Sequence, residues 1–215
     1  MKKEILVVLS TSALMLSTSV VNASLVNSIS GGIIFDMPAI NSISMGPIYD
    51  PSGITWSSTM DSIYGRKSVY GFANNGRWDT NLTMVGLDFS FGTMTFSFAE
   101  TLSAVGGFIN YAQLGGIPLG GAPTIAIYDS ADNLIELAVL NFQTSNNLNG
   151  GFFYGFEDPT SSIKYFKLSN SFISLANLTT REATPSEVPL PASFPLMFSG
   201  LAGFGILARR RKQTV

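Results

Sequence analysis

Two neighbouring segments in the middle of the chain alternate apolar and polar side chains with a period of two. Segment 87–91 reads Leu-Asp-Phe-Ser-Phe, and segment 94–98 repeats the pattern as Met-Thr-Phe-Ser-Phe. Successive side chains of a β-strand point to opposite faces, so this period predicts strands with one buried and one solvated face. Further apolar runs predict strands at residues 105–111, 124–128, 134–140, 151–156, 163–168 and 172–178.

These segments follow one another at short intervals, and turn-forming residues rather than amphipathic helices separate them. The clearest hairpin joins 124–128 to 134–140 through Asp-Ser-Ala-Asp-Asn at 129–133, since Asp and Asn tolerate the backbone of a turn. This spacing predicts an all-β fold, an antiparallel β-sandwich. Segment 24–53 is rich in Gly, Pro, Ser and Asn and predicts a first strand followed by a long connection.

Composition excludes several classes of site. The 215 residues include no Cys and no His, so the chain can build no Cys/His metal site, thiol nucleophile, Ser-His-Asp triad or disulfide. Residues 24–187 hold six basic and thirteen acidic residues, a formal charge of −7. An acidic domain repels phosphate backbones, which argues against nucleic acid as a partner.

The N-terminus has the three parts of a secretory signal peptide. Lys2 and Lys3 precede an apolar run, and Val-Asn-Ala at 21–23 supplies small residues in the positions that signal peptidase needs. We therefore expect a helical signal peptide over 1–23, with cleavage between Ala23 and Ser24.

The C-terminus combines an uncharged apolar stretch with a cluster of cations. No charged residue occurs from 188 to 208, a length that spans about 31 Å as a helix, close to the roughly 30 Å hydrocarbon core of a bilayer. The basic cluster that follows resists translocation and holds the end of the chain in the cytoplasm. It consists of Arg209, Arg210, Arg211 and Lys212. The pattern predicts a transmembrane helix in the inner membrane, with the preceding domain on the periplasmic side.

A proline motif, a Gly- and Leu-rich apolar stretch and a terminal arginine cluster, in this order over 188–215, resemble the PEP-CTERM sorting signal. The motif is Val188, Pro189, Leu190 and Pro191, with Leu190 where the family usually has Glu. The resemblance implies an exported protein of a Gram-negative bacterium that makes exopolysaccharide and biofilm. It also implies that the membrane enzyme exosortase processes the tail and that the product reaches the cell surface or the extracellular space.

The middle of the chain resembles the jelly-roll-type sandwich that often precedes such tails. The resemblance covers roughly residues 55–179 and includes segments 100–111, 128–133 and 151–156. We accordingly expect a jelly-roll-like domain over 24–179, a polar linker over 180–187 and the sorting tail over 188–215.

Acidic residues of the predicted hairpin offer a candidate calcium site. Asp129, Asp132 and Glu136 supply oxygen ligands of the kind that Ca²⁺ prefers, and Glu157 with Asp158 forms a second candidate pair. The alternative is that the two aspartates only stabilise the turn. No other cofactor is expected.

Two further patterns concern carbohydrate. Trp56 and Trp78 combine an apolar face with a polar edge, which suits stacking on a sugar ring, although packing in the core or under a loop is the favoured explanation. Paired carboxylates perform glycoside hydrolysis. The glutamates in the strand-rich region are Glu100, Glu136 and Glu157, and nothing in their sequence context favours catalysis.

Together these features predict a non-enzymatic surface or matrix protein with a structural or adhesive role in exopolysaccharide or biofilm. Its expected partners are signal peptidase, exosortase, the inner membrane and exopolysaccharide. A carbohydrate- or calcium-binding module is the first alternative, and a secreted glycosidase is the second.

Overall fold

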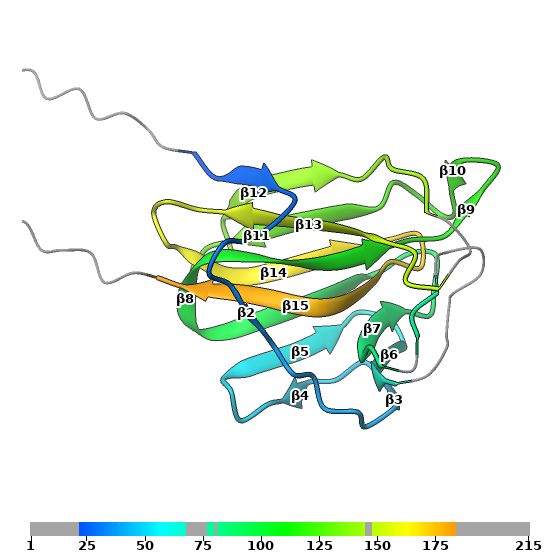
Figure 1. Ribbon diagram of the computed structural model, residues 1–215, viewed down its shortest axis with the longest axis horizontal. Helices are drawn as coiled ribbons and strands as arrows, with labels where there is room; N and C mark the ends of the chain where they lie inside the picture. The colour runs from blue at the N-terminus through cyan, green and yellow to red at the C-terminus, as the bar shows by residue number, and fades with distance from the viewer. Residues whose placement is uncertain (1–21, 68–76, 80, 145–147, 184–215) are drawn as a thin grey trace, which may run out of the picture. The chain divides into compact units, whose positions relative to one another are not determined.

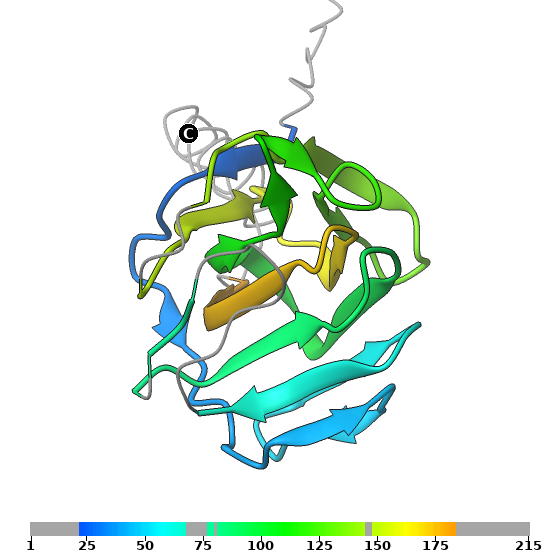
Figure 2. The same ribbon diagram turned by 90° about the vertical axis from the view of Figure 1, so that its right-hand side faces the viewer.

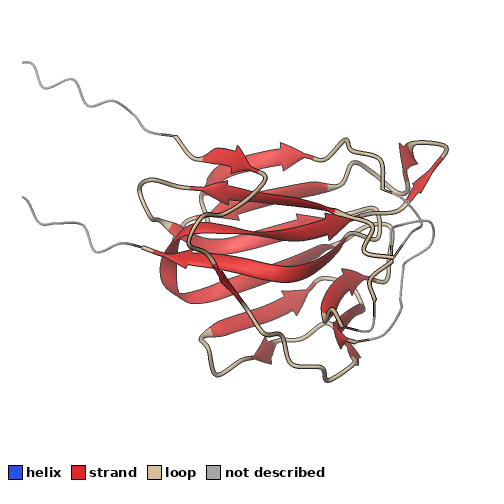
Figure 3. Cartoon of the chain, viewed as in Figure 1, coloured by secondary structure: helices blue, strands red, loops and turns tan. Residues whose placement is uncertain are grey.

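A computed structural model describes residues 22–67, 77–79, 81–144 and 148–183. Within these ranges every regular element is a β-strand (Figure 3), and no helix there is long and apolar enough to cross a membrane. The chain divides into two compact units, Met1–Glu182 and Ala183–Val215. The described strands all belong to the first unit. Residues 1–21 of the signal peptide predicted over 1–23, and the whole sorting tail predicted over 188–215, lie outside the described residues.

The strands fall into three groups along the chain. The N-terminal group is β1 (Ser24–Val26), β2 (Ile33–Ile34), β3 (Ser42–Ser44), β4 (Ile48–Tyr49), β5 (Ile54–Ser58) and β6 (Ser62–Arg66). The central group is β7 (Met84–Leu87), β8 (Thr93–Asn110), β9 (Gln113–Leu114) and β10 (Ile117–Pro118). The C-terminal group is β11 (Thr124–Tyr128), β12 (Leu134–Val139), β13 (Phe152–Glu157), β14 (Ile163–Ser169) and β15 (Ser174–Glu182).

The 18-residue strand β8 organises the whole arrangement (Figure 1). Its first half lies between β14 and β5, which gives one layer in the order β12-β11-β14-β8-β5-β4. Its second half lies between β13 and β15, which gives a second layer in the order β1-β13-β8-β15-β7-β6-β3. All these ladders are antiparallel, and the two layers form a β-sandwich joined through β8. The all-β, antiparallel prediction is confirmed.

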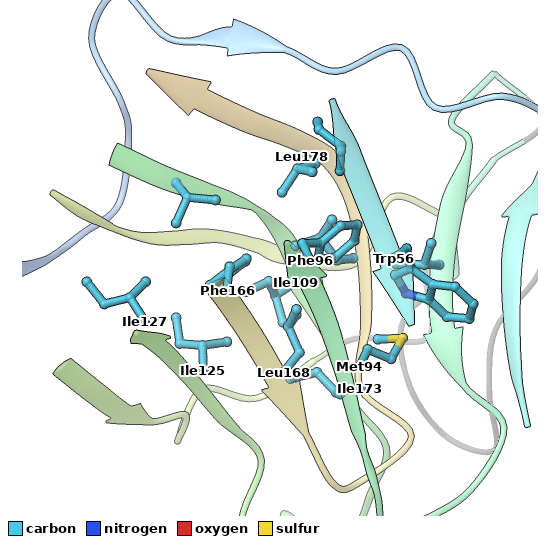
Figure 4. Close-up of a cluster of buried hydrophobic side chains, with 14 of the residues drawn as sticks. Trp56, Met94, Phe96, Ile109, Ile125, Ile127, Phe166, Leu168, Ile173 and Leu178 are labelled. Atoms are coloured by element: carbon cyan, nitrogen blue, oxygen red, sulfur yellow. The ribbon is translucent and has the colours of Figure 1, made fainter. Parts of the chain in front are cut away.

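Register aligns the core side chains in rows across the first layer. Trp56 of β5 lies opposite Phe96 of β8, Phe96 opposite Phe166 of β14, and Phe166 opposite Ile127 of β11. All four side chains are buried (Figure 4). Because side chains alternate along each strand, the neighbouring rows point to the outer face of this layer. Residues of the second layer, including Ile109, belong to the same buried cluster.

The structure refines several sequence expectations. Segment 87–91 is not one strand: β7 ends at Leu87, and Phe89 and Phe91 lie in an exposed bend. The segments predicted at 94–98 and 105–111 are two halves of the single strand β8. The predicted linker begins too early, because β15 continues to Glu182 and pairs with β8 along its length. Backbone pairing therefore extends the domain three residues beyond position 179.

Segment 24–53 is more structured than a long connection. It contributes β1, β2, β3 and β4, which pair with β13, β15, β6 and β5 respectively. Two views at right angles show this blue segment running along the outside of the strands from one layer to the other (Figures 1 and 2). We call residues 24–49 the N-terminal strap.

Candidate functional site: a polar groove on the outer face

A groove of about 560 Å³ lies on the outer face of the first layer. Strands β8, β11 and β14 form its floor, and β12 forms one side. The lining residues are Thr59, Thr93, Thr95, Thr124, Ala126, Tyr128, Leu137, Lys167, Ser169 and Asn170. The lining thus contains five hydroxyl-bearing Thr and Ser residues, one amide, one ammonium and one tyrosine ring, and no carboxylate.

The alternation that fills the core also produces this surface. Thr95 lies between the buried residues Met94 and Phe96 on β8, so its side chain points away from the core. Lys167 occupies the same kind of position on β14 and lies directly opposite Thr95. On the next strand, Ala126 is opposite Lys167 and has a side chain too small to fill the floor of the groove.

Lys167 is held in place by an anion and an aromatic ring. Its Nζ atom lies 2.7 Å from Oδ1 of Asp132 and 3.9 Å from the centre of the Tyr128 ring. A second ring, that of Tyr165, has its centre 5.8 Å away. Cation–π attraction and the ion pair together orient the ammonium group over the groove. The side chain of Lys167 remains 23% exposed, so it is accessible to a ligand.

Hydroxyl groups at the other end of the groove form a short network. Thr93 and Ser169 lie opposite each other on β8 and β14, and their Oγ1 and Oγ atoms are 2.8 Å apart. Thr59 Oγ1 accepts a hydrogen bond of 2.9 Å from the backbone N–H of Thr93. Hydroxyls both donate and accept hydrogen bonds, so this end of the groove matches a ligand that carries hydroxyl groups.

The two tryptophans predicted as sugar platforms are core residues. Trp56 is 0% exposed and packs against Tyr64, with ring centres 5.0 Å apart. Trp78 is 1% exposed and donates a hydrogen bond from Nε1 to Ser174 Oγ. Neither indole ring presents a face to solvent. The sugar-stacking interpretation of these residues is therefore wrong, and the core-packing alternative holds.

The two aspartates predicted as calcium ligands have other partners in the structure. Asp129 accepts hydrogen bonds from the backbone N–H groups of Ala131 and Asn133 and from the Asn133 side chain. These hydrogen bonds hold the pKa of Asp129 below its ordinary value, and the bond from the Asn133 side chain contributes most to this lowering. Asp132 pairs with Lys167 instead of turning toward Asp129. Within the described ranges no three acidic side chains gather in a way that could hold a metal ion.

The three glutamates proposed for glycoside hydrolysis lie on different elements. Glu157 of β13 pairs with Arg181, and its Oε1 lies 2.9 Å from the Arg181 Nη1 atom. Glu100 of β8 lines a separate hollow of about 230 Å³ together with Glu182, and Glu136 lies on the edge strand β12. Neither Glu136 nor Glu157 lines the hollow that contains Glu100. Asp158, the other half of the second calcium candidate, is buried and bonds to Thr160 and Ser162.

Sequence reasoning missed Tyr128, Lys167 and the threonines as site residues. The signal was present in the polar positions of the alternating segments, where Thr93, Thr95 and Ser97 occupy every second place. That Thr93 and Thr95 line the same groove as Lys167 and Tyr128 depends on the pairing of β8 with β14 and of β14 with β11. Such pairings between distant segments are not encoded in any local pattern.

Comparison with known proteins assigns no family to the chain. No protein-family model and no curated protein matches it. Among solved structures it is similar to a fucose-binding module of Streptococcus pneumoniae, SpX-3, with 16% identity and a TM-score of 0.31 over 48% of this chain and 73% of the module. It is also similar to the lectin domain of lectinolysin in complex with Lewis B antigen, with 12% identity and a TM-score of 0.30 over 49% of this chain and 74% of that domain. At these scores neither similarity assigns a ligand or a strand order.

Proposed function

We propose that this chain is an exported surface protein whose jelly-roll-like β-sandwich binds carbohydrate through the outer-face groove. The observation that carries the proposal is the lining of the groove by hydroxyl, amide and ammonium groups beside one tyrosine ring. A sugar offers hydroxyls to the polar groups and an apolar C–H face to the ring, which matches this lining. No carboxylate is among the lining residues, and Asp132 beside the groove is paired with Lys167, so the proposal concerns binding alone.

The route to the surface rests on the ends of the chain. A signal peptide cleaved after Ala23 exports the domain, and the tail with Arg209, Arg210, Arg211 and Lys212 retains it in the inner membrane until exosortase acts at the Val188–Pro191 motif. Binding to exopolysaccharide would then give the domain an adhesive role in the matrix. A reporter fused after Val215 should be cytoplasmic, whereas a periplasmic reporter would contradict this topology.

Binding by the groove is tested with the full-length chain in a mild detergent on an array of bacterial and host glycans. Tyr128→Ala removes the ring and should weaken binding about tenfold, because aromatic contacts of this kind contribute on the order of 1 kcal/mol. Lys167→Gln should reduce binding by a similar factor through the loss of the oriented ammonium group.

Tyr49→Ala is the matched control. Tyr49 lies on β4, is 75% exposed and does not line the groove. This variant should bind glycans as the wild type does. Equal loss in the Tyr49 and Tyr128 variants would place the contact elsewhere, and the absence of glycan binding by the wild type would favour a purely structural role in the matrix.

A further inference from the structure

Strand β12 is one of the two edge strands of the first layer, and the short strand β4 is the other. Within the described residues β12 pairs only with β11, in the register Ala126 to Leu137 and Thr124 to Val139. Natural sheets protect such edges with lysine, proline or a covering segment, because an open edge presents unpaired backbone groups to other chains. The sequence of β12, Leu-Ile-Glu-Leu-Ala-Val, contains neither lysine nor proline. It carries one charge, Glu136, and a β-bulge at Ile135, and residues 137–139 beyond them have neither a charge nor a bulge.

A hydrogen bond next to the end of β12 shows which of its residues bond to β11 and which direct their backbone groups outward. The backbone N–H of Leu140 donates to the carbonyl oxygen of Pro123 at 2.9 Å, which marks this position as a bonded pair of the ladder. Bonded and non-bonded pairs alternate in an antiparallel ladder, so Leu137 and Val139 direct their N–H and C=O groups away from β11. The Leu137 N–H has a contact of 3.4 Å with the Oε1 atom of its neighbour Glu136, which is long for a hydrogen bond.

The side chains of the same two residues are apolar and exposed. Leu137 is 44% exposed and Val139 is 58% exposed. Both combine an outward-facing backbone with apolar surface that a further strand would cover. The most favourable added strand therefore offers backbone N–H and C=O groups opposite both Leu137 and Val139. It also carries an apolar side chain opposite each of them.

We infer that β12 of a second copy of this chain is that added strand, antiparallel and related by a twofold axis at Ala138. In this register Leu137 of each copy lies opposite Val139 of the other, so the outward-facing backbone groups of both residues are paired. Glu136 lies opposite Leu140 of the second copy. A register centred on Glu136 would instead place two carboxylates opposite each other, which is unfavourable.

This pairing joins two grooves on one continuous sheet. Leu137 forms part of the groove lining, so the second copy's strand continues the surface beyond it. Two joined grooves would bind a repetitive polysaccharide with higher avidity than one. The avidity rests on the proposed carbohydrate binding, whereas the strand pairing does not and is tested separately.

Disulfide crosslinking tests the register. The chain has no cysteine, so a single introduced cysteine reports one position. Opposed residues of a non-bonded pair have Cα atoms about 4.5 Å apart, within the range that a disulfide spans. Ala138→Cys in the full-length chain should give a covalent dimer under mild oxidation. Ser130→Cys, in the exposed turn of the same hairpin, is the control and should crosslink about tenfold less. Equal crosslinking at the two positions would overturn the inference.

Mass measurement in solution tests the edge independently of cysteine. Leu137→Lys places a charge in the pairing and should reduce the mass of the detergent-solubilised chain from dimer to monomer. Leu134→Lys makes the same change on the same strand at a residue of similar exposure, 53%, outside the pairs around Ala138. It should leave the dimer intact. A wild-type chain that stays monomeric at high concentration would also overturn the inference, whatever the result on the glycan array.

Discussion

Strand β8 and the N-terminal strap both consist of extended chain, yet they are stabilised in different ways. In the first half of β8 every second residue is fully or nearly fully buried, and in the second half almost all are. The strap exposes large apolar side chains instead: Ile33 is 66% exposed, Ile43 61% and Tyr49 75%. Side-chain burial therefore holds β8 in place, whereas the strap contributes one buried side chain, Met37, with Phe35 and Ile48 partly buried, and otherwise depends on its backbone.

The strap is attached by short ladders and a few hydrogen bonds to both layers. The N–H of Phe35 donates to the carbonyl oxygen of Leu178 at 2.7 Å, and the N–H of Ser58 donates to the carbonyl oxygen of Met45 at 2.8 Å. Arg181 donates from Nη1 to the carbonyl oxygen of Ser30 at 3.2 Å. Segments with few buried apolar contacts open at lower free energy than the core. The comparison thus predicts a hierarchy of local stability within one sandwich.

The largest expected effect is at the centre of the core. Phe96→Ala removes a ring that is 0% exposed and lies between Trp56 and Phe166 in the buried row. Removing a buried phenylalanine forfeits its transfer free energy and leaves a cavity, which costs about 3–5 kcal/mol. Urea unfolding followed by tryptophan fluorescence measures this loss. Phe91→Ala is the control, since Phe91 is 53% exposed, and should change the free energy of unfolding by about 0.5 kcal/mol or less.

The same contrast explains which parts of the fold were predictable from the sequence. The hairpin of β11 and β12 and the burial of Met94, Phe96 and Phe98 followed from alternation, because a half-buried strand has a side-chain period of two. The strap has strands of only two or three residues, and a period cannot be recognised over so few positions. The strands of the strap form because β13, β15, β6 and β5 offer backbone groups for them to pair with. The sequence of the strap itself does not contain this information.

The candidate site was less predictable than the fold. The large aromatics Trp56 and Trp78 drew attention as ligand contacts, but a tryptophan on a strand is equally able to fill the core, and here both do. Tyr128 and Lys167 come together only because β11 pairs with β14. The position of the groove thus depends on tertiary pairing, whereas the polar character of its floor depends on local alternation.

A buried polar residue next to β8 should show an intermediate effect. Asp158 is 2% exposed, and its oxygens accept hydrogen bonds from the backbone N–H and side-chain hydroxyl groups of Thr160 and Ser162. Burial acts to raise the pKa of Asp158, but these hydrogen bonds outweigh it and lower the pKa below its ordinary 3.8. Asp158→Asn replaces an acceptor oxygen by a donor and should cost about 1–3 kcal/mol at pH 7.

The pH dependence of this variant follows from the direction of the shift. A carboxyl whose pKa is lowered on folding stabilises the native state above its unfolded pKa, and this contribution is lost as pH falls through the folded pKa. The difference in unfolding free energy between wild type and Asp158→Asn should therefore be constant near neutral pH and shrink below about pH 4. A difference that stayed unchanged down to pH 2 would show that the ionised carboxylate is not the source of the stability.

The smallest change in the free energy of global unfolding is expected for a substitution of Arg181, which hydrogen-bonds to Ser30 of the strap. Its Nη1 atom lies 2.9 Å from Oε1 of Glu157, and the two side chains are 34% and 33% exposed, so the ion pair contributes about 0–1 kcal/mol. Arg181→Gln should barely alter global unfolding but should accelerate amide hydrogen exchange in residues 24–32, while β8 exchanges as before. Lys67→Gln, at an exposed lysine, should change neither region and controls for the loss of a positive charge. Equal acceleration of exchange in the strap and in β8 would contradict the predicted hierarchy. It would mean that the two regions open as one cooperative unit, because loss of a contact in such a unit lowers the opening free energy of all its parts.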